Sequence, residues 1–360
     1  MNNIHEWLNT LNAYIYDPNT KVNDANIDIP HDIVVNNPQS IQNKLENRLL
    51  LPNIPQNKIK HLVISGGATW GLSAYGVVRE CHRQGFLNIN NLESIYGTSI
   101  GSLLAVFFTL KYDFDILDDY IVRRPWQHVW NANMYSIMDM IDSCGIYQYK
   151  HIEEIFRPLF AALDISIDIT MEDFYQFTGV DLHIFVTEIN DFKCIDFSHT
   201  THPEWKLIEV VYGSCTVPFI FAPLRRDDKC YIDGGFFANY PLDTAIHNLR
   251  AANPEIEDIE DDILGIELGV FTDEEYEKSH ISKSTQIFDY ATTILNKLLR
   301  NILFSNGHTK TKYEIFVHSS FMTVSDIILA VSSEEHRRKM INFGTEEAYQ
   351  YFDRIFTVKN

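Results

Sequence analysis

Short apolar runs alternate with longer amphipathic stretches from residue 61 onward, a pattern that predicts strands followed by helices. The run Leu62-Val63-Ile64 is followed by Gly66-Gly67, as expected for a buried strand that meets a tight turn. A helix is predicted from Thr69 to Gln84, with Gly85 as its C-terminal stop. A second strand is predicted from Leu92 to Tyr96, just before another Gly-rich turn. The main domain is therefore expected to begin near residue 60.

The rest of the chain continues this alternation. Helical segments are expected between Asp113 and Phe177, interrupted at Pro125 and Pro158. A hairpin is predicted from residues 181–187 and 193–197, joined by a turn at Asn190-Asp191. Further strands are expected at 230–232, 263–270 and 313–318, and further helices at 285–303 and 334–352. Strands that alternate with helices indicate an α/β fold, a three-layer α/β/α sandwich.

The first 59 residues differ in composition: they are rich in Asn, Asp and Pro and contain only short apolar groups. They are expected to form an N-terminal extension that packs on the main domain, residues 60–360. The start of the chain lacks the basic and continuously apolar stretch of a secretory signal. The longest apolar run, Ser99–Leu110, is too short to span a bilayer. A cytoplasmic location is expected, with peripheral contact to membranes left open.

Charge and cysteine content narrow the classes of function. The formal net charge of −20 argues against nucleic acid as a partner, because that affinity rests on neutralising phosphates with Lys and Arg. It also disfavours attraction of the whole protein to an anionic membrane. The basic run Arg337-Arg338-Lys339 is expected to be a solvated, charged face. The five cysteines are odd in number and include no C-x-x-C pair, so neither a disulfide framework nor a zinc knuckle is indicated.

The clearest chemical motif is the G-x-S-x-G sequence at residues 97–101, between a predicted strand and a predicted helix. A serine at such a turn adopts a strained backbone that projects its hydroxyl above the sheet, and the flanking Gly97 and Gly101 avoid collisions with neighbouring backbone. The helix N-terminus adds positive potential where negative charge develops. Taken alone, the motif is equally compatible with an ordinary Gly-rich turn.

A Gly-rich loop occupies residues 65–71, again where a strand meets a helix. Its exposed backbone N–H groups are suited to a phosphate or to the oxyanion of an acyl transfer. The loop lacks the Lys-Ser/Thr ending of a P-loop and the spacing of a dinucleotide site. An oxyanion hole is therefore the better interpretation.

A third motif places Asp233 at the end of a short strand, before Gly234 and Gly235. A nucleophilic serine needs a base within hydrogen-bond reach, and a carboxylate serves if its surroundings raise its proton affinity above the usual value near 3.9. A turn that simply begins with Asp is the alternative for this motif alone.

Together, in chain order, these motifs are similar to the four signature blocks of patatin-like phospholipases. The blocks are the loop at Gly66-Gly67, the Ser99 turn, residues 213–223, and Asp233-Gly234-Gly235 with Asn239 and Pro241. The resemblance covers residues 60–241 well and the C-terminal part loosely. It implies a three-layer fold with a mainly parallel central sheet and hydrolysis of acyl esters in phospholipids or related lipids, at a membrane or micelle surface, without metal or cofactor.

The resemblance also implies residue roles. Ser99 would be the nucleophile and Asp233 the base, a catalytic pair without histidine. The oxyanion hole would consist of the backbone N–H groups of Gly66, Gly67 and Ala68, and the supporting glycines would be Gly97, Gly101, Gly234 and Gly235.

Two positions depart from the family pattern. The family loop usually has three consecutive glycines and a basic residue, where this chain has Ala68 and Trp70. Ala68 is tolerable if its φ angle is negative. Trp70 removes a cation that would help with phosphate groups. It is expected either at the mouth of the site, against acyl chains, or packed in the core.

Other functions remain open. A Ser-His-Asp esterase would use a late histidine such as His247 or His318. A member of the family without activity would bind lipid or a partner protein through the same cleft. The aromatic stretch at residues 126–140 is a candidate lid or lipid-facing cap, with plain core packing as the alternative.

Overall fold

The computed structural model describes residues 50–130, 142–269, 309–319 and 324–356, with a few single positions between 281 and 297. The predicted extension up to residue 49, most of the helix predicted at 285–303 and most of the candidate lid lie outside these ranges. At the boundary of the main domain, Ile54 and Ile59 already belong to the hydrophobic core.

Eight strands within the described ranges form one sheet, in the order β10-β9-β1-β2-β4-β8-β7, with β5 paired to β4. The five strands from β10 to β4 are parallel, and β5, β8 and β7 join antiparallel. A mainly parallel central sheet is therefore confirmed. The strands are β1 (His61–Ile64), β2 (Ser94–Thr98), β4 (Asp181–Glu188), β5 (Lys193–Phe197), β7 (Leu224–Arg226), β8 (Lys229–Asp233), β9 (Ile263–Gly269) and β10 (Tyr313–His318), and a second sheet pairs β3 (Gly145–Tyr147) with β6 (Phe219–Phe221).

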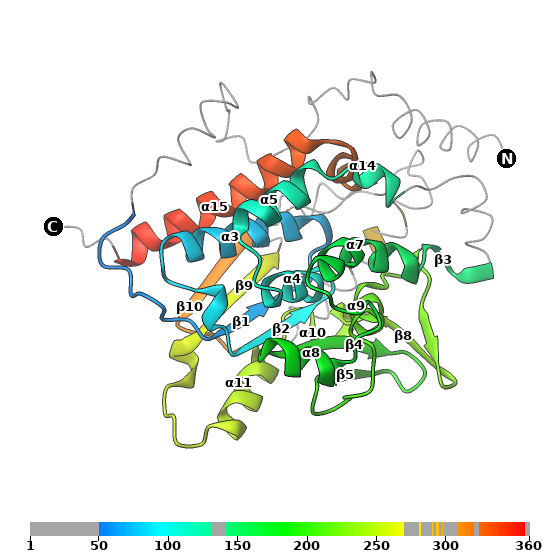
Figure 1. Cartoon of the computed structure of the whole chain (residues 1–360), viewed down its shortest axis with the longest axis horizontal. Coiled ribbons are helices and arrows are strands. Elements are labelled where there is room, and N and C mark those ends of the chain that lie inside the picture. Colours follow the sequence, from blue (N-terminus) through cyan, green and yellow to red (C-terminus); the bar gives the residue numbers. More distant parts are fainter. Residues whose placement is uncertain are drawn as a thin grey trace.

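Helices lie on both faces of the sheet, as the alternating side chains of its strands require (Figure 1). The described α-helices are α3 (Gly71–Arg83), α4 (Ile100–Thr109), α5 (Phe114–Arg123), α7 (Tyr149–Ala162), α8 (Met171–Thr178), α9 (Leu207–Cys215), α10 (Gly235–Ala238), α11 (Leu242–Ala252), α14 (Val324–Ser332) and α15 (Glu334–Phe356), and the 3₁₀ turns are η2 (Ala68–Trp70), η3 (Ile89–Asn91), η4 (Trp126–His128) and η5 (Ile259–Asp262). Val63 of β1 packs in a cluster with α11, whereas Leu62 and Ile64 pack in the core with α3 and α4. The predicted three-layer α/β/α sandwich is confirmed.

The long C-terminal helix α15 packs against α3 (Figure 1). The two backbones approach closely: a Cβ atom at Gly76 would lie 2.0 Å from the carbonyl oxygen of Ile341, and one at Gly344 would lie 1.8 Å from that of Ser73. Glycine is required at both positions because any side chain would push the helices apart. This contact attaches the C-terminal part of the chain to the layer above the sheet.

Most predicted elements are confirmed, with shifts at their ends. Strand β2 begins two residues later than predicted and runs to Thr98, directly before the serine turn, and α15 extends four residues further, to Phe356. The predicted break at Pro158 is wrong, because Pro158 lies inside α7.

The contacts of Arg124 explain how α7 tolerates this proline. A proline in a helix leaves the carbonyl four residues earlier without its N–H partner. Here that carbonyl belongs to Glu154, and the guanidinium of Arg124 donates to it at 2.8 Å. Arg124 comes from the loop after α5, so a tertiary contact replaces the missing helical hydrogen bond.

Candidate active site

Ser99 occupies the turn between β2 and α4 and has a strained backbone, with φ 54° and ψ −125°. The turn is tight: a Cβ atom at Gly97 would lie 2.6 Å from the carbonyl carbon of Gly101, and one at Gly101 would lie 2.4 Å from the carbonyl oxygen of Ile64. The predicted tight turn, with a serine in a strained backbone conformation between a strand and a helix, is therefore present. The N-terminus of α4 begins at Ile100, directly behind the serine, and supplies positive potential there.

Pairing with β4 brings Asp233 to the serine turn. Thr98, the last residue of β2, is opposite Phe185 of β4, and Asp233, the last residue of β8, is opposite Val186. Because Phe185 and Val186 are consecutive, the ends of β2 and β8 meet at the same place along β4. Residues 134 positions apart in sequence thus become neighbours.

Ser214 of α9 fixes the backbone of Ser99. The Ser99 N–H donates to Ser214 Oγ at 2.8 Å, and that hydroxyl donates to the carbonyl of Phe185 at 2.7 Å. On the other side, Ser102 Oγ donates to the Ser99 carbonyl at 2.6 Å. The sequence motif containing Ser214 was recognised, but its hydrogen bonds to the Ser99 turn were not predicted.

The carboxyl group of Asp233 is buried, with 7% of the residue exposed. Its Oδ1 accepts a hydrogen bond from the Gly235 N–H at 2.7 Å, whereas Oδ2 has no hydrogen-bond partner within the described part of the chain. Burial raises the pKa of Asp233 to about 6, against the opposing effects of the Ser99 hydroxyl and the Gly235 N–H. The Ser99 hydroxyl thus lies near enough to act on the carboxyl group, although no hydrogen bond of normal geometry joins it to Oδ2. Contacts of this kind commonly tighten only when substrate binds.

The predicted oxyanion loop has one donor fewer than expected. The Gly66 N–H donates to the Asn239 carbonyl at 2.8 Å, so Gly66 is not a free donor. The N–H groups of Gly67 and Ala68 form no hydrogen bond within the described residues. The negative φ required for a well-tolerated Ala68 is also absent, because this residue has φ 48°. A left-handed alanine is strained, since its Cβ approaches the following carbonyl.

Trp70 packs against the protein and does not line the site. Its ring meets that of Phe343 on α15 edge to face, with 5.9 Å between the centroids. The neighbouring Thr69, by contrast, lines the cavity beside Ser99. The packing explanation for Trp70 is therefore favoured over a place at the mouth of the site.

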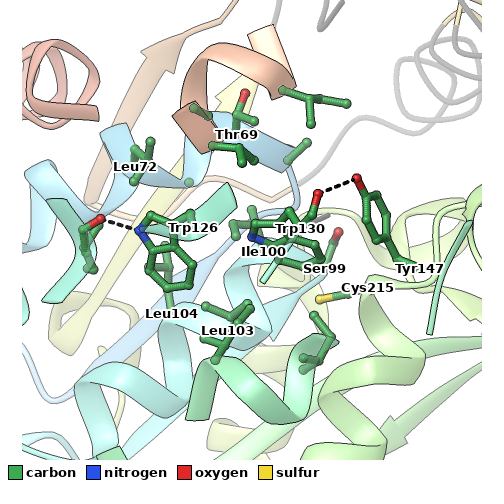
Figure 2. Close-up of a pocket in the computed structure, with 18 of the residues that line it drawn as sticks. Thr69, Leu72, Ser99, Ile100, Leu103, Leu104, Trp126, Trp130, Tyr147 and Cys215 are labelled. Atoms are coloured by element: carbon green, nitrogen blue, oxygen red, sulfur yellow. Dashed lines mark hydrogen bonds between the residues drawn. The ribbon is translucent and has the colours of Figure 1, made fainter. Parts of the chain in front are cut away.

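Ser99 opens onto a cavity of about 240 Å³ whose walls are almost entirely apolar. Figure 2 shows Ser99, Tyr147 and Cys215 at one end and Trp126 and Leu72 toward the other. Much of the remaining wall comes from four helices, through Leu103, Leu104 and Phe107 of α4, Ile121 of α5, Ile152 and Ile155 of α7, and Ile327, Ala330 and Val331 of α14. Trp126 and Trp130 also line it, so the described start of the candidate lid is part of this wall.

The two late histidines lie away from this arrangement. Both His247 and His318 are exposed, and His318 is 3.8 Å from Glu347 of α15. None of the described histidines lines the cavity. Within the same part of the chain, no group of three or more His, Cys, Asp or Glu side chains is arranged to hold a metal ion, and no helix is long and apolar enough to cross a membrane.

Comparison with known proteins places this arrangement in a family. The family model described as patatin-like phospholipase matches residues 62–246, more than half of the chain. The chain belongs to the patatin-like phospholipase family. The match contains the Gly-rich loop, the serine turn and Asp233.

Several proteins of known name are similar to this family member. A probable lipid hydrolase of Invertebrate iridescent virus 6 is 27% identical over 199 residues, which are 53% of this chain and 65% of that protein. A triacylglycerol lipase of Schizosaccharomyces pombe is 23% identical over 208 residues, 52% of this chain and 41% of the lipase. The chain thus spans less than two thirds of the length of these relatives. The crystal structure of VipD from Legionella pneumophila aligns with a TM-score of 0.46 and 14% identity, over 87% of this chain and 73% of VipD.

Proposed function

We propose that this patatin-like protein is a lipid acyl hydrolase in which Ser99 attacks the ester and Asp233 is the general base. The observation that carries the proposal is the buried Asp233, whose pKa is raised to about 6, next to a serine on a strained turn. A pKa near 6 leaves the carboxylate ionised at neutral pH yet more basic than an exposed aspartate.

The first half of the reaction forms an acyl-enzyme. Asp233 takes the proton of the Ser99 hydroxyl as its oxygen bonds to the ester carbonyl carbon. The carbonyl oxygen becomes an oxyanion, stabilised by the N–H groups of Gly67 and Ala68 and by the N-terminus of α4. The bond to the leaving alcohol then breaks, and protonated Asp233 returns the proton to that alcohol.

The second half releases the fatty acid. Asp233, ionised again, takes a proton from a water molecule whose oxygen attacks the acyl carbon. The bond to Ser99 Oγ breaks, and the serine recovers its proton from Asp233. No histidine takes part, in agreement with the exposed positions of His247 and His318.

The cavity supports an acyl chain as the group that Ser99 accepts. Its wall is formed by Leu, Ile, Phe and Trp side chains, and burial of each methylene there contributes about 0.8 kcal/mol. The names of the two relatives, a probable lipid hydrolase and a triacylglycerol lipase, point the same way. We assign the activity to the phospholipase A or lysophospholipase type of carboxylic ester hydrolase.

We also propose that residues 60–360 form one catalytic domain. The sheet supports this: β10 pairs with β9 at its edge, and β9 pairs with β1. The helix α15 supports it further, because it packs closely on α3. The first 59 residues are then an extension, whose described end is buried at Ile54 and Ile59.

Labelling with a fluorophosphonate probe tests the proposal directly. An activated serine reacts with the probe, so the wild-type protein is expected to label and Ser99→Ala to remain unlabelled. Asp233→Asn is expected to lower both labelling and fatty-acid release by about a thousandfold or more, because the base is lost.

The rival functions give different results in the same experiment. A binding module without activity would leave every variant unlabelled while still retaining lipid. A Ser-His-Asp esterase would tolerate Asp233→Asn and lose activity when His247 or His318 is replaced. A lipid panel with Ser99→Ala as the control, read by mass spectrometry, then identifies the ester that is cut.

A further inference from the structure

One wall of the Ser99 cavity comes from a part of the chain that the family match does not include. Ile327, Ala330 and Val331 of α14 line the cavity, and the match ends at residue 246. The helix α14 has only nine residues. A helix this short is not stable by itself, so its place over the cavity depends on tertiary contacts.

Arg337 of α15 supplies such a contact. Its Nη1 donates to the carbonyls of Ala330 at 2.8 Å and Val331 at 3.0 Å, near the C-terminal end of α14. Its Nε and Nη2 donate to the carbonyl of Val122, at 3.0 and 2.6 Å, near the C-terminal end of α5. One guanidinium thus joins the ends of two helices that both line the cavity.

The residue itself is unusual for an arginine. It is 3% exposed, although the run Arg337-Arg338-Lys339 predicted a solvated face, and it also lines the apolar cavity. Burial lowers the pKa of Arg337 to about 10, so the side chain remains charged at neutral pH. Helix C-termini carry partial negative charge, which stabilises a cation placed between them. The guanidinium presents five donors in a rigid fork and makes four hydrogen bonds here, more than the three N–H donors of a lysine ammonium can make.

We propose that Arg337 is a positioning residue that latches α14 across the cavity of Ser99 and thereby sets the preference of the enzyme for long acyl chains. The inference rests on the proposed function. Without the hydrogen bonds of Arg337, the wall formed by Ile327, Ala330 and Val331 is no longer fixed. The part of a bound acyl chain that packs against this wall is then exposed to water. The C-terminal end of α14 is held next to Val122 of α5, four residues before Trp126, and Trp126 lies toward the other end of the cavity from Ser99 (Figure 2). A short acyl group bound near Ser99 therefore depends less on this end of the wall.

Substitution of two neighbouring arginines tests the latch. Arg337→Met removes all four hydrogen bonds and leaves an unbranched apolar side chain in their place. Arg338→Met is the matched control, because Arg338 is the next residue of α15 and lies outside the cavity lining. For p-nitrophenyl palmitate, Arg337→Met is expected to raise KM about tenfold, the effect of a few methylenes losing contact. For p-nitrophenyl butyrate, KM is expected to rise several-fold less than for the palmitate, so the ratio of the two changes is the measured effect, and Arg338→Met should leave both esters unchanged. Arg337→Lys should fall between.

A binding measurement separates this inference from the proposed function. In the Ser99→Ala background, a fluorescent long-chain fatty acid is expected to bind about tenfold more weakly with Arg337→Met than without it. If the wild-type protein hydrolyses neither ester, the proposed function fails while the binding result still decides the latch. Equal losses on both esters, or unchanged binding and selectivity, would overturn the latch.

A second pair of variants covers the case in which Arg337→Met unfolds. Ile327 and Ile328 are adjacent on α14 and both half-buried. Of these two residues, Ile327 lines the cavity and Ile328 does not. Ile327→Ala should weaken long-chain binding and Ile328→Ala should not. Identical effects of the two substitutions would show that α14 is no wall for the acyl chain.

Discussion

Asp233, the proposed base, has a raised pKa because of its surroundings. Its carboxyl group is almost fully buried, and the neighbouring Cys215 is a neutral thiol whose own pKa is raised far above the usual value by burial. No cation of the described residues offsets the burial of this carboxylate, and its desolvation outweighs the hydrogen bond from Gly235. The same hydrogen bond keeps the carboxyl group in place, so the residue is both basic and fixed.

The acid limb of the activity profile is expected near pH 6. Asp233 must be ionised to accept the Ser99 proton, so kcat/KM for a short ester should fall about tenfold per pH unit below 6 and stay level above it. The pKa of Asp233 is raised from 3.8, so the folded state binds this proton more tightly than the unfolded state does. With respect to this group, stability therefore rises as the pH falls from 6 toward 3.8, and the loss of activity precedes acid unfolding. A limb near pH 4, or one coincident with unfolding, would contradict this assignment.

Ala68 carries a second strain at the site, on the backbone. Its left-handed conformation costs about 1 to 2 kcal/mol relative to glycine. Part of this gain is offset in a glycine variant, because glycine loses more conformational entropy on folding. Ala68→Gly is expected to raise the free energy of unfolding by about 1 kcal/mol and to leave turnover within about twofold, because the N–H donor remains. Urea denaturation and ester hydrolysis check both parts. As a control, Ala74→Gly within α3 should destabilise by about 1 kcal/mol or more, and equal signs for the two variants would refute the argument.

At the scale of elements, the hairpin of β4 and β5 is joined by a buried histidine. His183 of β4 contacts Asp196 of β5 through Nδ1 at 2.9 Å and Asp181 through Nε2 at 3.3 Å. Tyr96 of β2 stacks on the imidazole ring with 4.2 Å between the centroids. Burial by itself would lower the pKa of His183, but hydrogen bonds and attraction from Asp181 and Asp196 outweigh burial and raise it to about 9. The cation thus holds neighbouring strands of the sheet together.

This histidine is expected to make the fold less stable at high pH. Because the folded pKa of His183 lies above the ordinary 6.5, its contribution is fully present below pH 6.5 and is lost as the pH rises through about 9. The free energy of unfolding should fall by roughly 3 kcal/mol across that window. Urea denaturation of the wild-type protein and of His183→Gln at several pH values measures it. If the free energy of unfolding of the wild-type protein falls with pH no more steeply than that of His183→Gln, a charged His183 is ruled out.

Local pattern predicted seven of the eight described strands of the main sheet, all but β7, and it placed the proposed site residues at strand ends, but it did not predict the wall of the cavity. Ser99 and Asp233 each follow a short apolar run, so both were expected at strand ends, and the register on β4 brings those ends together. The burial of Arg337 was missed because a run of three basic residues reads as a charged surface. The positive φ of Ala68 could not be predicted either, because contacts distant in sequence determine it. The backbone of this loop is positioned by residues of β9 and of the segment after α10.

At the scale of the whole molecule, net charge should decide on which lipid surfaces the proposed hydrolase is active. The net charge of −20 repels an anionic bilayer, and this repulsion is screened by salt because the Debye length falls from about 30 Å at 0.01 M to about 8 Å at 0.15 M. Hydrolysis is therefore expected to be faster on neutral phosphatidylcholine vesicles than on vesicles containing about one third phosphatidylglycerol at low salt.

The same repulsion predicts how salt changes this preference. Raising the ionic strength to about 0.15 M should restore most of the rate on the anionic vesicles and leave the neutral vesicles unaffected, because screening removes the long-range term only. Fatty-acid release from both kinds of vesicle measures the effect, and p-nitrophenyl butyrate, which needs no surface, is the control for salt effects on the chemistry itself. A faster rate on the anionic vesicles at low salt would mean that a local basic surface outweighs the net charge, and the whole-molecule argument would then be wrong.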